Sequence, residues 1–249
     1  MFEQVKIILI NTTHPGNVGA VARAMKNMGF KHLYLVSPQC FPSAEAVARA
    51  SGAEDILAEA VVVNSLTEAL ADCHWAMGVS ARLRKVPWPI KMARAAAIEI
   101  VDNLQRRPEL KIALVFGQEQ SGLLNEELMQ CHCQIMIPAN PLYASLNLAQ
   151  AVQILSYELR MAILESEKNA PNVPLEPTEA FATVEEIERF YTHLSETLVT
   201  IRFLDPAQPG HLMVHLRKLY AKARLTKVEL NILRGILTAF KNANSLLYD

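Results

Sequence analysis

The chain has 249 residues, of which 51% are hydrophobic and 20% charged, and this composition excludes a globally disordered protein. Its formal net charge of -1 argues against a wholly basic nucleic-acid coat, although it allows a local basic face. The N-terminus lacks a secretory signal pattern, and no apolar run approaches the roughly 18 residues of a membrane span. We therefore expect a cytoplasmic protein whose four cysteines, Cys40, Cys73, Cys131 and Cys133, are reduced.

Short apolar runs alternate with helical periodicity along residues 1–164. The runs predict strands at Lys6–Ile10, His32–Val36, Val61–Val63, Trp75–Val79, Ile112–Phe116 and Gln134–Ile137. Helices are predicted at Asn17–Met28, Ala44–Ala60, Leu66–Ala71, Met92–Leu104 and Asn125–Gln130, with a turn over Ser80–Pro89 and a loop over Gly117–Gly122. This alternation predicts an α/β fold, with a mostly parallel sheet, helices on both faces, and ligands at the carboxyl ends of the strands.

The stretch from Gln134 to Arg160 combines a short strand, a loop rich in Pro and Asn, and a long helix. The helix is expected from Leu146, because apolar residues recur every three or four positions, at Leu148, Val152, Leu155 and Leu159. A strand end followed by a helix N-terminus presents backbone N–H groups and loop carbonyls to a ligand. An ordinary strand-to-helix connection explains the same pattern equally well.

Residues 165–180 change to a composition of Asn, Glu and Pro, which predicts a linker. Beyond it, residues 181–249 are expected to form a small all-α domain, because Thr183 with Glu186 and Thr226 with Glu229 have capping-box spacing, and residues 212–221 have a helical pattern. Its last two helices carry several cations: Arg217, Lys218, Lys222, Arg224, Lys227 and Arg234. These cations form either a solvated face or a patch that contacts phosphates.

Several familiar catalytic patterns are missing. The first loop has Gly16-x-x-Gly19 but lacks the rest of a dinucleotide fingerprint, and no P-loop occurs. Neither the cysteines around His132 nor the pair His211 and His215 has the further ligands of a zinc site, so no metal is expected. Ser145 is not in a nucleophile elbow. Arg23 lies off the apolar stripe of its helix, which predicts a solvent position.

Three segments taken together carry a resemblance. NTTHPGNVGAVARAMKNMGF near the start, LVFGQEQSGLLNEEL in the middle and IPANPLYASLNLAQAV after it resemble the three motifs of the SPOUT (TrmH/SpoU) RNA ribose methyltransferases. The tail segments ERFYTHL and LRKLYAKARLTKVELNILRGIL extend this resemblance to nearly the whole chain and look like the TrmJ branch. The resemblance implies a parallel sheet with a C-terminal trefoil knot. It also implies methylation of the ribose 2′-hydroxyl of the pyrimidine at position 32 in the tRNA anticodon loop, with S-adenosylmethionine as the methyl donor.

The matching positions imply a set of site residues. The donor-binding residues would be Ser80, Ala81, Gly117, Ile137, Ala144, Ser145 and Leu146, with Glu119, Gly122 and Asn147 shaping the loops around them. The catalytic residues would be Arg23, Asn17 and Ser145. A guanidinium is a poor base in its resting form, so Arg23 is expected to anchor the phosphate and orient the hydroxyl, with its role as base left open.

The resemblance further implies a homodimer that shares its active site between chains, with Arg23 facing the second subunit. Three positions depart from the family pattern: Val79 replaces a common Thr, and Gln118 and Gln120 replace common basic residues beside Glu119. The loss of two cations near an RNA cleft would weaken backbone binding or shift substrate preference. The alternatives are an enzyme that methylates ribosomal RNA, a catalytically silent RNA-binding module and, more distantly, a nucleotide-dependent oxidoreductase.

Overall fold

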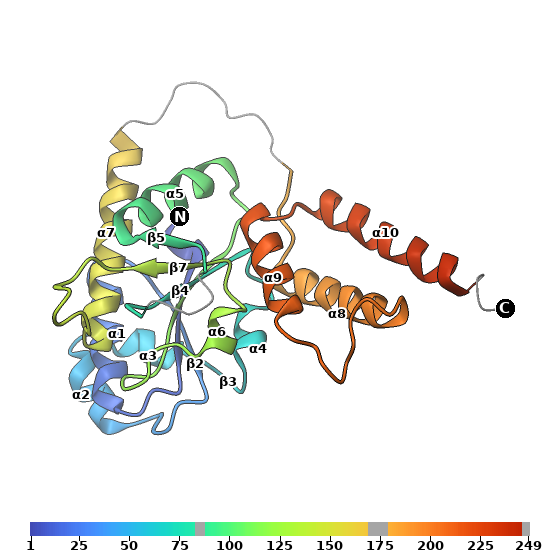
Figure 1. The fold of residues 1–249 in the computed structure, drawn as a ribbon. Coiled ribbons are helices and arrows are strands. Elements are labelled where there is room, and N and C mark those ends of the chain that lie inside the picture. The colour runs from blue at the N-terminus through green and yellow to red at the C-terminus, as the bar shows by residue number, and fades with distance from the viewer. Residues whose placement is uncertain (83–87, 169–178, 246–249) are drawn as a thin grey trace.

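The computed structural model describes residues 1–82, 88–168 and 179–245. A seven-stranded sheet forms the centre, with the order β3-β2-β1-β6-β4-β7-β5 and parallel pairing throughout (Figure 1). Its strands are β1 Val5–Ile10, β2 His32–Val36, β3 Val61–Val63, β4 Trp75–Val79, β5 Ile90–Met92, β6 Ile112–Phe116 and β7 Cys133–Met136. The predicted parallel α/β fold is confirmed.

Helices cover both faces of this sheet. The first 3-10 turn and the helices that follow are η1 Phe2–Gln4, α1 Pro15–Met28, α2 Ala44–Ala50, α3 Glu54–Ala58, α4 Leu66–Leu70, α5 Ala93–Arg106, α6 Asn125–Leu128 and α7 Leu148–Lys168. The core on one face includes residues of α1, α2, α3, α5 and α7. The core on the other face includes residues of the short α4 and α6, together with Val184 from the C-terminal part of the chain. The two faces are therefore covered unequally.

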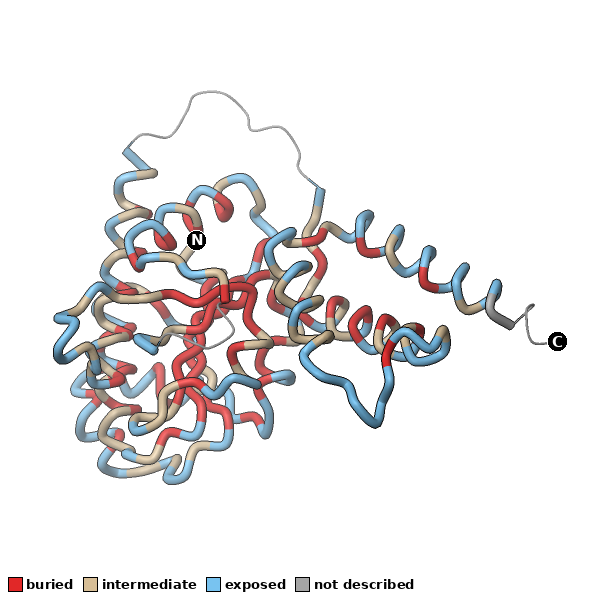
Figure 2. Tube along the Cα trace, in the orientation of Figure 1, coloured by how far each residue is buried: buried red, intermediate tan, exposed pale blue. Residues whose placement is uncertain are grey.

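The interior strand β1 contributes side chains to both cores. Val5, Ile7 and Leu9 belong to the first core, whereas Ile8 and Ile10 belong to the second. All five are buried, as a strand with helices on both sides requires. Figure 2 shows the buried residues concentrated along the strands. Apart from Lys6, β1 is a continuous apolar run rather than an alternating one, which is the sequence signature of a strand buried on both faces.

Helices α8 Val184–Thr200, α9 Leu212–Ala223 and α10 Lys227–Ser245 form a C-terminal helix bundle. The bundle has its own small core, in which Phe190, Leu194 and Leu230 are buried. It also completes the poorly covered face of the sheet, because Val184 belongs to the core there and its N–H donates to the Cys73 carbonyl at 2.7 Å. Both predicted capping boxes are present, at Thr183 with Glu186 and at Thr226 with Glu229.

The structure corrects several predicted boundaries. The helix expected over Ala44–Ala60 is two helices, because Ser51 and Gly52 have φ of 44° and 90° and break it. Strand β5 was not predicted, since three residues at the sheet edge carry too little pattern. Helix α7 begins at Leu148 rather than Leu146 and runs to Lys168, past the expected start of the linker at 165. Residues 169–178 of that linker and residues 83–87 of the predicted turn lie outside the described residues.

No helix in the described part of the chain is long and apolar enough to cross a membrane. The described cysteines are all free thiols, with Cys40 exposed and the other three buried.

Two helical glycines provide a matched test of packing. A Cβ atom on Gly19 in α1 would lie 2.1 Å from the Ala46 carbonyl oxygen of α2, whereas one on Gly235 in α10 would meet nothing within 4 Å. We expect Gly19→Ala to lower the free energy of unfolding by about 1–3 kcal/mol through overpacking. Gly235→Ala should raise it by up to about 1 kcal/mol through helix propensity. Urea denaturation followed by circular dichroism measures both, and a neutral Gly19→Ala would contradict the close approach of α1 and α2.

Candidate active site

A cavity of about 300 Å³ opens at the carboxyl ends of β4, β6 and β7. Three loops form most of its wall, which is lined by Val79, Ser80, Ala81, Arg82, Phe116, Gly117, Gln118, Glu119, Gln120, Ser121, Gly122, Ile137, Ala144, Ser145, Leu146, Leu148 and Ala151. All seven residues predicted to bind the donor are among them. The structure therefore brings together residues that lie up to 66 positions apart in the chain, from Ser80 to Leu146.

The loop after β7 is held by the helix that follows it. The Asn147 side-chain oxygen accepts a hydrogen bond from the Ala149 N–H at 2.9 Å, and Gln150 Oε1 accepts from the Asn147 N–H at 3.2 Å. These reciprocal bonds cap the N-terminus of α7. Because Asn147 is the cap, the two residues before it belong to the loop and face the cavity.

The Glu119 carboxylate joins the loop after β6 to the loop after β1. Its Oε2 accepts from the Thr13 N–H and the Thr13 hydroxyl, both at 3.1 Å. Its Oε1 accepts from the His14 N–H at 3.3 Å and from Asn17 Nδ2 at 3.0 Å. The carboxylate also lies at the N-terminus of α1, where the helix dipole favours a negative charge.

Asn17 extends this network to the third loop. Its Oδ1 accepts from Asn147 Nδ2 at 3.1 Å, while its Nδ2 donates to Glu119. The hydrogen bonds from Glu119 to Asn17 and from Asn17 to Asn147 thus connect the three segments that carried the family resemblance. Sequence reasoning named these residues but did not show that their side chains bond to one another.

The hydrogen bonds also set the charge of Glu119. Partial burial alone would raise its pKa, but the bonds donated by Asn17 and by the backbone of Thr13 and His14 outweigh burial and lower the pKa below its ordinary value. Glu119 is therefore ionised at neutral pH, as an acceptor of four hydrogen bonds should be.

Gly117 permits a tight turn beside the cavity. The Gly122 N–H donates to the Gln118 carbonyl at 2.8 Å, and Gly122 has a φ of 64°, in the left-handed region. A Cβ atom on Gly117 would lie 2.2 Å from the Gly122 carbonyl carbon and 2.3 Å from the Leu123 nitrogen. Glycine is thus required at position 117 because the loop folds back onto it.

The three predicted catalytic residues have different positions. Ser145 is exposed and lines the cavity, whereas Asn17 contacts the cavity wall through Glu119. Arg23 lies on α1, is exposed as its off-stripe position predicted, and is not part of the cavity wall. Within the described residues of this single chain, Arg23 has no hydrogen-bond or ion-pair partner.

The weaker sequence candidates have ordinary structural positions. His132 is buried and its Nδ1 accepts a hydrogen bond from the Ala76 N–H at 3.1 Å, and burial lowers its pKa to about 4. His132 is therefore neutral at pH 7. No group of three or more His, Cys, Asp or Glu side chains in the described ranges is arranged to hold a metal ion.

Family models match both parts of the chain. The model of the SpoU rRNA methylase family matches residues 4–157, which is more than half of the chain. The chain belongs to the SpoU methylase family. A second model, that of the TrmJ C-terminal domain, matches residues 185–247 and covers the C-terminal helix bundle.

Relatives within this family match along nearly the full length. The chain is 49% identical over 243 residues to the tRNA (cytidine/uridine/adenosine-2′-O-)-methyltransferase TrmJ of Pseudomonas aeruginosa strain UCBPP-PA14, covering 96% of this chain and 94% of the relative. It is 46% identical to the tRNA (cytidine/uridine-2′-O-)-methyltransferase TrmJ of Escherichia coli strain K12, covering 98% of each. These matches place the chain in the TrmJ branch of the SpoU family.

Solved structures have the same fold. The crystal structure of TrmJ from Z. mobilis ZM4 is 31% identical, covers 95% of this chain and 98% of that chain, and has a TM-score of 0.80. The SpoU methyltransferase AviRb from Streptomyces viridochromogenes, solved in complex with the cofactor AdoMet, is 19% identical with a TM-score of 0.53. At that identity AviRb supports the fold alone.

Replacement of Glu119 tests the network that holds the loops. Both carboxylate oxygens accept hydrogen bonds, so in Glu119→Gln the amide NH₂ must face N–H or O–H donors. We expect the variant to lose about 1–3 kcal/mol of unfolding free energy at pH 7. Because the pKa of Glu119 is lowered in the folded protein, this contribution is complete above the ordinary value of 4.5 and is lost as the pH falls through the folded-state pKa.

Urea denaturation of both proteins from pH 7 to about pH 3 measures this effect. The gap between wild type and Glu119→Gln should be constant near neutral pH and shrink at the acidic end. A gap that stays constant to pH 4 and below would show that the charge of Glu119 does not hold the loops.

Proposed function

We propose that this chain is an S-adenosylmethionine-dependent methyltransferase that modifies the ribose 2′-hydroxyl of a tRNA nucleotide. The observation that carries the proposal is the cavity, whose wall contains every residue that the family motifs assign to the donor. Its volume of about 300 Å³ lies at the lower end of the range for small-molecule sites. The relatives that match along the full length are named as tRNA 2′-O-methyltransferases, which supports tRNA as the substrate.

The lining residues fit such a donor. Ile137, Leu146 and Leu148 are apolar residues of the wall, while Ser80, Gln118 and Ser121 are polar ones. The bound donor would supply an electrophilic methyl group on a sulfonium. Gly117 serves this site by allowing the loop after β6 to close on itself, so a larger side chain there would displace the wall rather than fill the cavity.

The acceptor hydroxyl must be positioned and must lose its proton as the new bond forms. Ser145 is the predicted catalytic residue that lies in the cavity wall, so we assign it to the acceptor side. The Asn17 side-chain amide donates to Glu119 through Nδ2 and accepts from Asn147 through Oδ1. Because both of its polar atoms are engaged in this way, we assign Asn17 to positioning of the loops. Arg23 is assigned to the phosphate beside the reacting ribose.

Arg23 is outside the cavity wall of its own chain, and this supports the proposal of a homodimer with the active site at the subunit interface. In such a dimer the exposed face of α1 would bring Arg23 toward the partner's cavity. The C-terminal trefoil knot stays a prediction. The interior position of β7, between β4 and β5, is compatible with it.

We further propose that the modified nucleotide is the pyrimidine at position 32 in the anticodon loop, that the C-terminal helix bundle contacts the tRNA, and that the enzyme acts in the cytoplasm. A ribosomal RNA substrate is the alternative, favoured by the description of the family that matches residues 4–157. Gln118 and Gln120 line the cavity as polar, uncharged side chains. They would bind an RNA backbone less strongly than cations at the same positions.

Transfer of labelled methyl from S-adenosylmethionine to unmodified bulk tRNA tests the proposal. Nuclease digestion locates the label, and we expect it on a 2′-O-methylated pyrimidine of the anticodon loop. Label on ribosomal RNA but not on tRNA would overturn the substrate assignment. No donor binding would overturn the enzyme assignment in favour of a silent RNA-binding module.

Substitution of Arg23 separates catalysis from donor binding. Since Arg23 lies outside the cavity wall, Arg23→Ala should bind S-adenosylmethionine with near wild-type affinity in calorimetry. Its methyl transfer to tRNA should fall by at least about 100-fold, because the variant loses both positioning and charge at the acceptor. Arg23→Lys tests whether charge alone is sufficient, and near wild-type turnover of Arg23→Ala would remove Arg23 from the mechanism.

A further inference from the structure

The six cations that the sequence groups in the last two helices divide into two sets. Three of them serve the protein itself. Arg217 donates to both carboxylate oxygens of Glu188, and its guanidinium lies 4.3 Å from the centre of the Tyr191 ring. These contacts tie α9 to α8 within the bundle.

Arg224 and Lys227 are the other two structural cations. Arg224 lies 4.3 Å from the centre of the Trp75 ring and 3.7 Å from the Glu99 carboxylate, so it attaches the bundle to the sheet and to α5. Lys227 pairs with Glu186 at 3.3 Å, between the starts of α10 and α8. Three of the six cations are therefore engaged within the protein and unavailable to a ligand.

Lys218 and Lys222 of α9 have no such role. Within the described residues neither has a hydrogen-bond or ion-pair partner. His211 and His215 precede them, and the four positions are separated by four, three and four residues. At 3.6 residues per turn they fall within roughly 60° of one another, so they form one stripe along the helix, named here the α9 stripe.

The α9 stripe lies opposite the packed side of the helix. Met213, Leu216 and Tyr220 pack against the core of the bundle, about half a turn away from the stripe. The segment Leu212–Ala223 contains no Asp or Glu, so no carboxylate of α9 offsets the charge. The stripe is about 17 Å long at 1.5 Å per residue, which is enough to follow several nucleotides of a strand.

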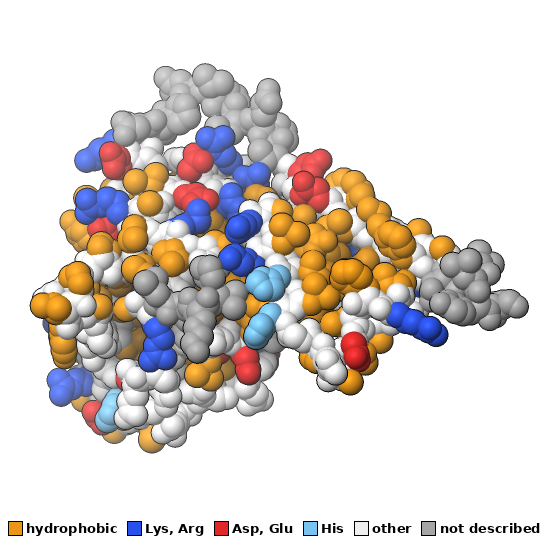
Figure 3. All heavy atoms as spheres, viewed as in Figure 1, with side chains coloured by type: hydrophobic (Ala, Val, Ile, Leu, Met, Phe, Trp, Pro, Cys, Tyr) orange, Lys and Arg blue, Asp and Glu red, His pale blue; other side chains and the backbone are white. Residues whose placement is uncertain are grey.

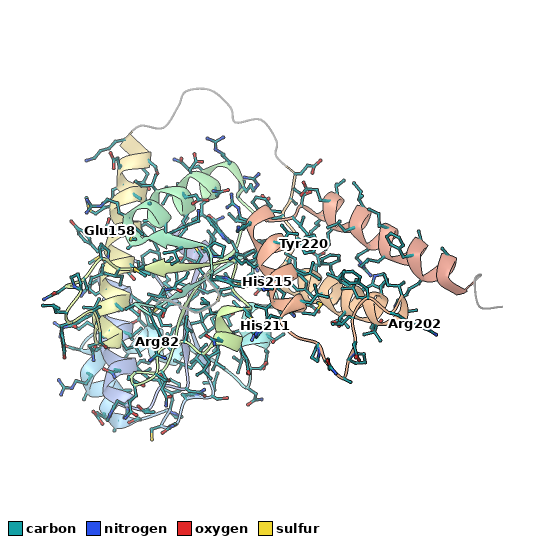
Figure 4. The ribbon with its side chains drawn as sticks, in the orientation of Figure 1. Arg82, Glu158, Arg202, His211, His215 and Tyr220 are labelled. Atoms are coloured by element: carbon teal, nitrogen blue, oxygen red, sulfur yellow. The ribbon has the colours of Figure 1, made fainter. Side chains whose placement is uncertain are left out.

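The stripe and the cavity share one face of the molecule. Figure 4 shows His211 and His215 on the same side as Arg82, which belongs to the cavity wall. Figure 3 shows Lys or Arg side chains gathered beside histidine side chains on this face. An anionic chain with its reacting ribose at the cavity could therefore extend across the surface toward α9.

We infer that the α9 stripe is the surface by which the C-terminal helix bundle holds the phosphate backbone of the tRNA. The inference rests on the proposed function and adds to it which cations make the contact. Lys218 and Lys222 neutralise phosphates, and the two imidazoles donate to phosphate oxygens or stack on unpaired bases. The Arg234 side chain is exposed and has no hydrogen-bond or ion-pair partner among the described residues, but it is on α10 rather than on the α9 stripe, so we expect it to take no part.

The test compares full-length variants in filter binding to unmodified tRNA over a range of salt concentrations. The double variant K218A/K222A should bind roughly tenfold more weakly. The slope of log affinity against log salt should become shallower by about 1.4–1.8, since two phosphate contacts are lost. K218R/K222R, which keeps both charges, should restore affinity and slope.

Arg234→Ala is the matched control for a cation of the same bundle outside the stripe, and it should bind like wild type. A loss of affinity in Arg234→Ala as large as the loss in K218A/K222A would overturn the inference, as would wild-type affinity and slope in K218A/K222A. Thermal unfolding and S-adenosylmethionine binding should be unchanged in every variant. Wild-type protein that neither binds nor methylates tRNA would overturn the proposed function itself, whereas normal methylation by wild type with an unchanged double variant would overturn the α9 stripe alone.

Discussion

The candidate site depends on one partly buried carboxylate, that of Glu119. Glu119 accepts four hydrogen bonds from Thr13 and His14 in the loop after β1 and from Asn17 in the first turn of α1. Asn17 in turn accepts a hydrogen bond from Asn147, just before the start of α7. The loops after β1, β6 and β7 are thereby fixed relative to one another at one edge of the sheet. A flexible set of loops would have to be ordered by the ligand, and that cost would reduce affinity. The network therefore prepares the cavity before any ligand enters.

The second constraint is the unequal cover of the sheet. Helices α4 and α6 are too short to cover their face, and Val184 at the start of α8 fills part of the gap. Arg224 adds a stacking contact on Trp75. Because these contacts are part of the sheet's own core, the C-terminal helix bundle has a defined place beside the methyltransferase domain. The α9 stripe consequently has a fixed direction relative to the cavity.

Much of this structure could be predicted from sequence because the signals were local. The continuous apolar runs of β1 and β6 indicated buried parallel strands, and the capping pairs at Thr183 and Thr226 indicated helix starts. The seven residues that the resemblance assigns to the donor came from motifs with a fixed order, and all of them line one cavity. Local patterns and motif matches are enough to predict a feature when that feature depends on residues close together in the sequence.

Sequence patterns did not reveal features for which the deciding contact is distant in sequence. Arg217 and Lys218 are adjacent cations, and only the position of Glu188, on another helix, separates a structural ion pair from a free charge. Strand β5 exists because β7 pairs with it, and nothing in Ile90–Met92 alone signals that partner. The motif match assigned Gly117 to the donor, but the atoms that require glycine at this position belong to Gly122 and Leu123. Such contacts depend on the tertiary fold.

A structure of the protein crystallised with S-adenosylmethionine would test the central claim most directly. The account predicts the donor in the cavity at the ends of β4, β6 and β7, in contact with the segments around Ser80, Gly117 and Ser145, with the Glu119 hydrogen bonds unchanged. A donor bound at another place, or a cavity that forms only after the Glu119 bonds break, would contradict it.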